Sequence, residues 1–140
     1  MILNCAIIDE DPEALALLKH YVEETPSLNL IGAYHNAIEA VDGIHHSHLD
    51  ILFLAIHMQQ ISGLEFAKLV PMNVKIIFTT AFKEYAIEAY KVNAFDYLVK
   101  PILYEDFMQT CQKVFDHYMQ DDAYNPIKRD GFVVVKNESK

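Results

Sequence analysis

Five short apolar runs, rich in β-branched and aromatic residues, recur along this chain and are separated by longer stretches with helical spacing. The runs cover residues 2–8, 28–34, 51–55, 74–79 and 95–99. Their length and composition predict buried β-strands. We expect helices over residues 12–24, 37–45, 63–70, 83–92 and 104 to about 119. In the first of these, Leu15, Leu18 and Val22 form one apolar stripe, as a helix packed on a sheet requires.

Strict alternation of strands and helices predicts an α/β fold with a parallel sheet covered by helices on both faces. Parallel neighbours need a crossover connection, and a helix usually supplies it. The uninterrupted apolar run 51–55 fits a strand that is buried on both sides. In doubly wound sheets of this kind, ligands bind at the carboxyl ends of the strands. Candidate functional residues are therefore expected at the carboxyl ends of the predicted strands.

Composition excludes several classes of function. The 140 residues are 52% hydrophobic, which is sufficient for one domain with a substantial core. The net charge of -9 leaves no basic stripe for a nucleic-acid backbone, so any DNA contact needs another part of the protein. No signal peptide and no membrane span is expected, which favours a cytoplasmic protein. Cys5 and Cys111 have no metal-binding spacing and are expected to be reduced, buried thiols.

Three acids follow the first predicted strand directly. Asp11 before Pro12 is a normal helix start, with the carboxylate capping free amides. Capping does not explain Asp9 and Glu10. Carboxylates that close together repel each other, and a hard cation such as Mg²⁺ would relieve that repulsion. A metal site is one interpretation of this pair, and a solvated acidic loop is the other.

The ends of the later strands carry further polar residues. Ser62 and Gly63 predict a turn into the third helix, and Thr79 and Thr80 lie at the end of the fourth strand. Lys100 closes the fifth, and its bond to Pro101 is a candidate cis peptide. Taken singly, such a threonine is usually a cap or a strand former, and such a lysine is usually solvated. Together they bring acids, a hydroxyl and an amine to one edge of the sheet.

This combination resembles the receiver domain of two-component response regulators, the CheY-like superfamily. The resemblance covers about residues 2–119 and is carried by DEDP, FLAIHMQQISGLEF, IIFTTAFKEYAIEAY and NAFDYLVKP, in that order. It is strongest to the N-terminal receivers of LytTR-type transcriptional regulators. The resemblance implies a flavodoxin-like sheet with strand order 2-1-3-4-5, a signalling domain rather than an enzyme, and a sensor histidine kinase as partner.

The resemblance also implies roles for individual residues. Asp9 and Glu10, with the backbone carbonyl of His57, would hold Mg²⁺. Thr80 and Lys100 are the remnants of the phosphoryl site. Tyr97 would be the aromatic switch residue.

One departure from the family pattern decides the functional prediction. The position of the phosphate-accepting aspartate is Ala55, and a methyl group offers no oxygen nucleophile. Aspartyl phosphorylation there is excluded, and Mg²⁺ binding is expected to be weakened. Phosphorylation of His57 instead has no support from strand alternation. Gln59 stands where similar sequences usually have proline, which favours natural loss of the aspartate over an engineered alanine.

The end of the chain differs from the rest. We expect a receiver-like domain over residues 1–119, a polar linker over 120–130, and over 131–140 the first strand of a truncated LytTR-type DNA-binding domain. A homodimer is expected through the fourth helix, fifth strand and fifth helix, roughly residues 83–117, although the aromatic residues there could equally be core. The histidines near residue 45 are expected to be solvated.

Three functional hypotheses remain. The first is a pseudo-receiver that controls an attached DNA-binding domain through conformation or dimerisation. The second is an ordinary phosphorylated regulator that carries an engineered aspartate-to-alanine change. The third is a flavodoxin-like flavin-binding protein, which the acidic DEDPEA loop disfavours because a flavin phosphate needs amide-rich surroundings.

Overall fold

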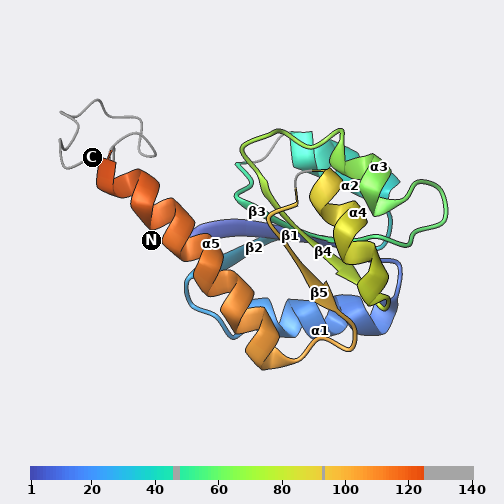
Figure 1. The fold of residues 1–140 in the computed structure, drawn as a ribbon, viewed down its shortest axis with the longest axis horizontal. Coiled ribbons are helices and arrows are strands. Elements are labelled where there is room, and N and C mark those ends of the chain that lie inside the picture. Colours follow the sequence, from blue (N-terminus) through green and yellow to red (C-terminus); the bar gives the residue numbers. More distant parts are fainter. Residues whose placement is uncertain (46–47, 93, 125–140) are drawn as a thin grey trace. The chain divides into compact units, whose positions relative to one another are not determined.

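The computed structural model describes residues 1–45, 48–92 and 94–124, and the chain divides into two compact units, Met1–Tyr104 and Glu105–Lys140. The first unit contains a five-stranded parallel sheet (Figure 1). Its strands lie in the order β2-β1-β3-β4-β5, which confirms the predicted doubly wound topology. They are β1 (Leu3–Ile8), β2 (Leu28–Tyr34), β3 (Ile51–Ala55), β4 (Lys75–Thr80) and β5 (Asp96–Val99).

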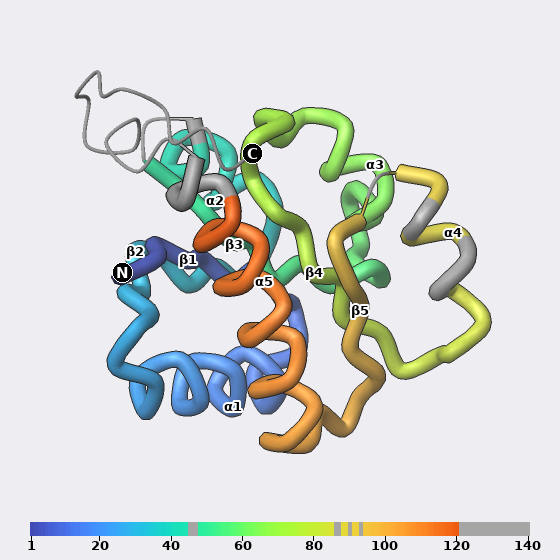
Figure 2. The backbone as a smooth tube through the Cα atoms, turned by 60° about the vertical axis from the view of Figure 1, so that its left-hand side comes forward, coloured from blue at the N-terminus to red at the C-terminus, as the bar shows by residue number. Residues whose placement is uncertain are grey.

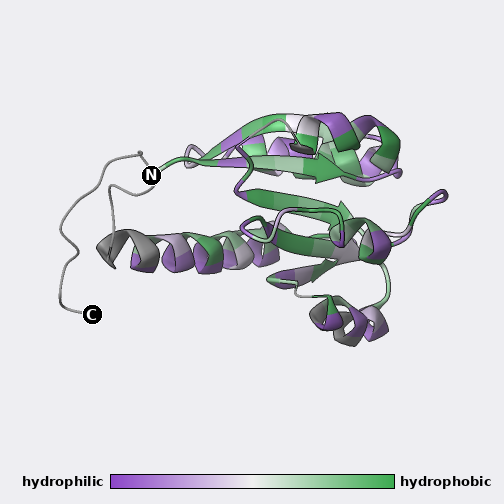
Figure 3. Ribbon diagram, turned by 90° about the horizontal axis from the view of Figure 1, so that it is seen from above, coloured by the Kyte–Doolittle hydropathy of each residue, from purple (hydrophilic) through white to green (hydrophobic). Residues whose placement is uncertain are grey.

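Helices cover both faces of this sheet (Figures 1 and 2). One face is covered by α1 (Pro12–Glu23). On the other, α2 (Ala37–His45), α3 (Gly63–Ala67) and α4 (Ala86–Lys91) contribute to a single apolar cluster with β1, β3 and β4. Alternate residues of each central strand therefore point into opposite layers of the core, and the strands form the most apolar part of the fold (Figure 3).

Capping residues set the starts of the helices beside the carboxyl edge. Asp11 Oδ1 accepts a hydrogen bond of 3.1 Å from the Glu13 amide, and Pro12 occupies the first helical position of α1. At α2, Asn36 Oδ1 accepts from the Glu39 amide at 2.9 Å. At α3, Ser62 Oγ accepts from the Glu65 amide at 3.1 Å. Each cap thus fixes the point at which the loop after a strand enters the next helix.

Tyr34, the last residue of β2, lies in space that two glycines leave free. A Cβ atom on Gly32 would come within 2.7 Å of Tyr34 Cζ, and one on Gly43 of α2 within 3.0 Å of the same atom. The first distance is shorter than real carbon atoms allow, and the second is tighter than most real contacts. The Tyr34 carbonyl also accepts a hydrogen bond of 3.1 Å from the Asp9 amide, which extends the pairing of β1 and β2 by one residue.

The third and fourth helices differ from their predicted bounds. The third was expected over 63–70 but ends at Ala67, and the amides of Lys68, Leu69 and Val70 bond three residues back instead of four. Pro71 disfavours α-helical backbone at the residue before it, which explains the tighter last turn. The fourth begins as a 3₁₀ turn, η1 (Lys83–Tyr85), before α4.

In the second unit the structure describes α5 (Tyr104–Tyr124), which continues past the predicted end near residue 119 and takes in the first residues of the expected linker. The segment before Pro126 contains no helix-breaking residue, so the helix continues. Its buried residues Phe107, Cys111, Val114 and Tyr118 lie on one stripe. The predicted strand at 131–140 lies outside the described residues. None of the described helices is long and apolar enough to cross a membrane.

Candidate functional site

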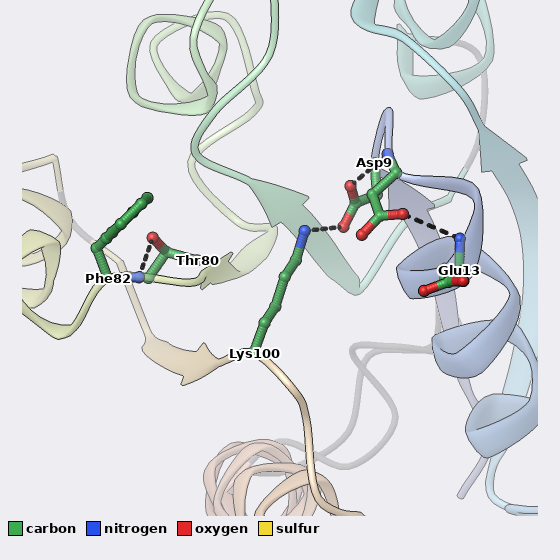
Figure 4. A network of polar contacts seen from close by, with 6 residues as sticks. Asp9, Glu13, Thr80, Phe82 and Lys100 are labelled. Atoms are coloured by element: carbon green, nitrogen blue, oxygen red, sulfur yellow. Dashed lines mark hydrogen bonds and ion pairs between the residues drawn. The ribbon is translucent and has the colours of Figure 1, made fainter.

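The candidate site lies at the carboxyl edge of the sheet, where β1, β3, β4 and β5 end (Figure 4). Asp9 follows β1, Ala55 ends β3, Thr80 ends β4 and Lys100 follows β5. The structure thus brings the predicted acid, hydroxyl and amine to one edge, as the strand order requires.

Asp9 and Lys100 form an ion pair. Lys100 Nζ lies 2.8 Å from Asp9 Oδ2, and the Asp9 side chain is only 2% exposed (Figure 4). Asp9 Oδ1 accepts a hydrogen bond of 2.9 Å from the Asp11 amide. Within the described residues, Lys100 gives Asp9 Oδ2 its only polar contact. Both oxygens of this buried carboxylate are therefore engaged by the protein itself.

The other two acids of the first loop also have protein donors. Glu10 Oε2 accepts a hydrogen bond of 2.9 Å from the Gln59 amide in the loop after β3. Asp11 caps α1 through the Glu13 amide. The three adjacent carboxylates each have a donor within the fold, so their mutual repulsion is offset without an external ion.

Ala55 is buried at the end of β3 and pairs in register with Thr79 of β4. Gly63 packs so closely against Ala55 that a Cβ atom on Gly63 would collide with the Ala55 carbonyl oxygen. The Gly63 amide donates a hydrogen bond of 2.7 Å to the Ile56 carbonyl, which returns the loop to the strand end. The loop from β3 to α3 is thus held tightly against the backbone at the end of β3, whose last side chain is only a methyl group.

Thr80 and Tyr97 occupy the positions predicted for them on β4 and β5. Thr80 is buried, and its Oγ1 accepts a hydrogen bond of 3.0 Å from the Phe82 amide (Figure 4). Tyr97 is half-buried, pairs in register with Phe78, and packs against the apolar cluster of α2, α3 and α4. Their roles as phosphoryl contact and switch stay predictions.

His57 is exposed and contacts two aromatic rings of the next loop. Its ring centroid lies 5.3 Å from that of Phe82 and 4.6 Å from that of Tyr85, both with edge-to-face geometry. We call His57, Phe82 and Tyr85 the aromatic trio. The sequence raised His57 as a carbonyl ligand and as an alternative phosphorylation site, but it did not predict this ring contact. The signal available was the pair of aromatic residues directly after a strand end.

The segment after β5 is anchored at several points. The Lys100–Pro101 peptide bond is cis, as the sequence suggested, and the Lys100 amide donates to the Thr80 carbonyl at 2.7 Å. Tyr21 of α1 donates a hydrogen bond of 2.9 Å to the Ile102 carbonyl, and its ring contacts Tyr104. Two cavities of about 370 Å³ flank the edge. One is lined by Asp11, Glu13, Ala14, Leu17, Ala81, Lys100, Pro101 and Ile102, and the other by Glu10, His35, Asn36, Gln59 and Gln60.

Cys5 lies in the core below the site. Burial, together with the negative charge of Asp50, raises the pKa of the Cys5 thiol from 9.0 to about 12. Cys5 and Cys111 are both buried thiols, as predicted.

The sheet order 2-1-3-4-5 defines a flavodoxin-like fold, and acids, a threonine and a lysine lie at its carboxyl edge. Residues 5–112 match the response regulator receiver domain, and the chain belongs to that family. Domains of this family serve signalling. Among its relatives is the transcriptional regulatory protein BtsR of Escherichia coli, 39% identical over 102 residues, which are 71% of this chain and 43% of BtsR.

A second relative is an uncharacterised response regulatory protein of Vibrio cholerae, 34% identical over 89% of this chain and 53% of its own length. The chain therefore spans about half the length of the curated relatives it matches. Among solved structures, the response regulatory domain of mrkE from Klebsiella pneumoniae aligns with a TM-score of 0.76 and 24% identity, covering 84% of this chain and 99% of that domain. A two-component response regulator from Clostridium difficile gives a TM-score of 0.72 at 24% identity, over 81% of this chain and 96% of that one. At this identity these likenesses show the fold alone.

Magnesium is the cofactor that the family implies, and the donor set present does not fit it. Mg²⁺ requires near-octahedral oxygen ligands at about 2.0–2.1 Å. Among the described residues, no group of three acidic, histidine or cysteine side chains is placed to hold a metal ion. Asp9 already has both oxygens engaged, and Ala55 contributes no side-chain oxygen.

Proposed function

We propose that this chain is the receiver part of a transcriptional regulator and that it signals without an aspartyl phosphate, through conformation or association. The observation that carries the proposal is the side chain at the end of β3. Ala55 is buried beside Thr79 and below Gly63, and it offers no atom that can attack a phosphoryl group.

The state of the neighbouring groups supports the same proposal. Lys100 is paired with Asp9, and the Thr80 hydroxyl is bonded to the Phe82 amide. Each of the two groups therefore already has a partner within the protein. A two-state element that lacks its covalent input must be biased by a ligand, a partner or self-association.

The partners follow from the relatives. BtsR is named a transcriptional regulatory protein, and this chain matches less than half of it. We propose a DNA-binding output domain, of LytTR type by resemblance, as the attached effector, and a sensor histidine kinase as the upstream protein. Homodimerisation through the region of α4, β5 and α5 would replace phosphorylation as the means of control.

The experiment restores the acceptor. Ala55→Asp and the unchanged protein are each treated with a small-molecule phosphodonor and Mg²⁺, and intact mass counts the phosphoryl groups. Ala55→Asn is the matched control, because it has the shape of aspartate without its nucleophilic carboxylate. We expect only Ala55→Asp to gain one phosphoryl group. Phosphorylation of the unchanged protein would overturn the proposal.

Association is measured in parallel by light scattering over a concentration series of the same three proteins. The proposal predicts that the unchanged protein reaches its associated state without phosphodonor, and that the donor leaves its mass distribution unchanged. A monomer at every concentration would remove dimerisation as the means of control and leave partner binding as the remaining route.

A further inference from the structure

We infer that the Lys100 ammonium is the resident cation of this site and takes the place of a divalent metal. In receivers the first-loop acids are the residues expected to hold Mg²⁺, whereas here the buried one is neutralised from within the chain. The inference concerns the metal alone, so it stands or fails independently of the proposed signalling function.

The geometry of Asp9 is the first step. Its side chain is 2% exposed, and an ionised carboxylate at such a position needs a counter-charge or strong donors. Lys100 Nζ at 2.8 Å supplies the charge, and the Asp11 amide at 2.9 Å supplies the donor to the other oxygen. The Lys100 side chain is itself 21% exposed, so the pair lies largely out of water.

The second step is the absence of a competitor for Lys100. At residue 55 the chain has a methyl group where an aspartate would compete with Asp9 for the ammonium. At the carboxyl edge of the sheet, Lys100 forms its ion pair with Asp9. Loss of one carboxylate therefore explains why the lysine and the first-loop acid are joined.

The third step is that the ammonium and a divalent cation exclude each other. A metal bound to Asp9 Oδ2 would meet the lysine charge on the same oxygen, and like charges at that separation repel strongly. The remaining acid, Glu10, is bonded to the Gln59 amide. Mg²⁺ would have to displace these protein donors and would gain no ligand from Ala55 in return.

The test measures thermal unfolding with and without Mg²⁺. The unchanged protein, Lys100→Gln and the control Lys91→Gln are each heated in about 10 mM MgCl₂ and in NaCl of equal ionic strength. Lys91 is a suitable control because it forms an exposed ion pair with Glu88. Lys91→Gln therefore removes the same charge as Lys100→Gln, but at the surface. The decrease in the electron paramagnetic resonance signal of free Mn²⁺ when protein is added reports metal binding directly.

For the unchanged protein and Lys91→Gln, we expect no shift of the unfolding midpoint on adding Mg²⁺ and no bound Mn²⁺. For Lys100→Gln, we expect a midpoint about 10 °C lower in NaCl, because Asp9 loses its counter-ion. Mg²⁺ should then raise the unfolding midpoint of Lys100→Gln by several degrees, and Mn²⁺ should bind to this variant. A response of the unchanged protein equal to that of Lys100→Gln would overturn the inference, as would a Lys100→Gln protein indifferent to both metals.

A second variant keeps the test decisive if Lys100→Gln does not fold. Ala55→Asp adds a carboxylate that competes for Lys100 and can also bind metal. We expect it to gain a Mg²⁺-dependent rise in midpoint and to bind Mn²⁺. Failure of Ala55→Asp to respond to either metal would contradict the inference, whatever its behaviour toward phosphodonors.

Discussion

Thr79 and Thr80 are adjacent and equally buried, yet only one of their hydroxyls has a hydrogen-bond partner. Thr80 Oγ1 accepts from the Phe82 amide at 3.0 Å, whereas Thr79 Oγ1 has no partner among the described residues. Because side chains alternate along a strand, the two hydroxyls enter different layers of the core. Thr79 lies beside Ala55 in the ladder, next to the missing carboxylate.

This difference predicts opposite results for the same substitution. Thr79→Val removes a buried hydroxyl that makes no bond, so we expect the free energy of unfolding to stay unchanged or to rise by up to about 1 kcal/mol. Thr80→Val leaves the Phe82 amide without its acceptor and should lower that free energy by about 1–2 kcal/mol. Urea unfolding measures both, and each variant is the control for the other. Equal losses would contradict the assignment of the two hydroxyls.

Gly63→Ala tests the close approach of the β3–α3 loop to Ala55. The added Cβ atom would collide with the Ala55 carbonyl oxygen, which is backbone and cannot rotate away. Overpacking of this kind typically costs about 1–3 kcal/mol, and we expect a value at the upper end. Gln60→Ala, an exposed change in the same loop, is the control. A Gly63→Ala protein as stable as that control would show that the loop can move.

Cys5 predicts how stability depends on pH. The folded thiol has a pKa of about 12 against 9.0 in its ordinary state, so the folded protein keeps a proton that the unfolded chain releases above pH 9. The contribution of the protonated thiol to the free energy of unfolding is therefore fully present below pH 9. It is lost as the pH rises from 9 to 12. The expected slope is about 1.4 kcal/mol per pH unit in that window.

Comparison with Cys5→Ala isolates the contribution of the thiol to the free energy of unfolding, because tyrosines and lysines titrate in both proteins. The stability difference between the two should shrink from pH 8 to pH 10.5 in urea unfolding. A difference that stays constant would mean that the thiol titrates normally in the folded protein.

His57→Ala tests whether the aromatic trio fixes the start of the fourth helix. The ring contacts with Phe82 and Tyr85 each have the geometry of pairs worth about 0.5–1.5 kcal/mol. Their loss should speed hydrogen exchange at the Tyr85 amide, which bonds to the Phe82 carbonyl at 3.2 Å. His48→Ala removes an exposed histidine elsewhere and should leave that amide unaffected.

Most of the fold could be predicted from the sequence because buried parallel strands are nearly uniform apolar runs. The observed bounds of β2 and β3 coincide with the predicted ones. β1 and β5 begin one residue later than predicted, and both ends of β4 lie one residue further along the chain. Helix ends were less predictable. The early end of α3 depends on Pro71 and on three-residue bonding, and the length of α5 depends on the absence of a breaker before Pro126.

For the site, the sequence predicted which residues share one edge but not how they pair. Strand order places Asp9 and Lys100 together in any fold of this topology. Whether the lysine joins an acid or remains solvated depends on side-chain geometry, and no periodicity encodes it. The bond from the Gln59 amide to Glu10 and the contacts of His57 likewise arise between loops that are distant in sequence.

The position of Asp9 also depends on an element far from the charged groups. Its amide bonds to the carbonyl of Tyr34, and the Tyr34 ring lies in the space that Gly32 and Gly43 leave open. The first acid of the site is thus positioned through the packing of β2 against α2. A larger residue at position 43 would meet the Tyr34 ring, so the residue whose carbonyl holds the Asp9 amide also depends on the small size of one residue of α2.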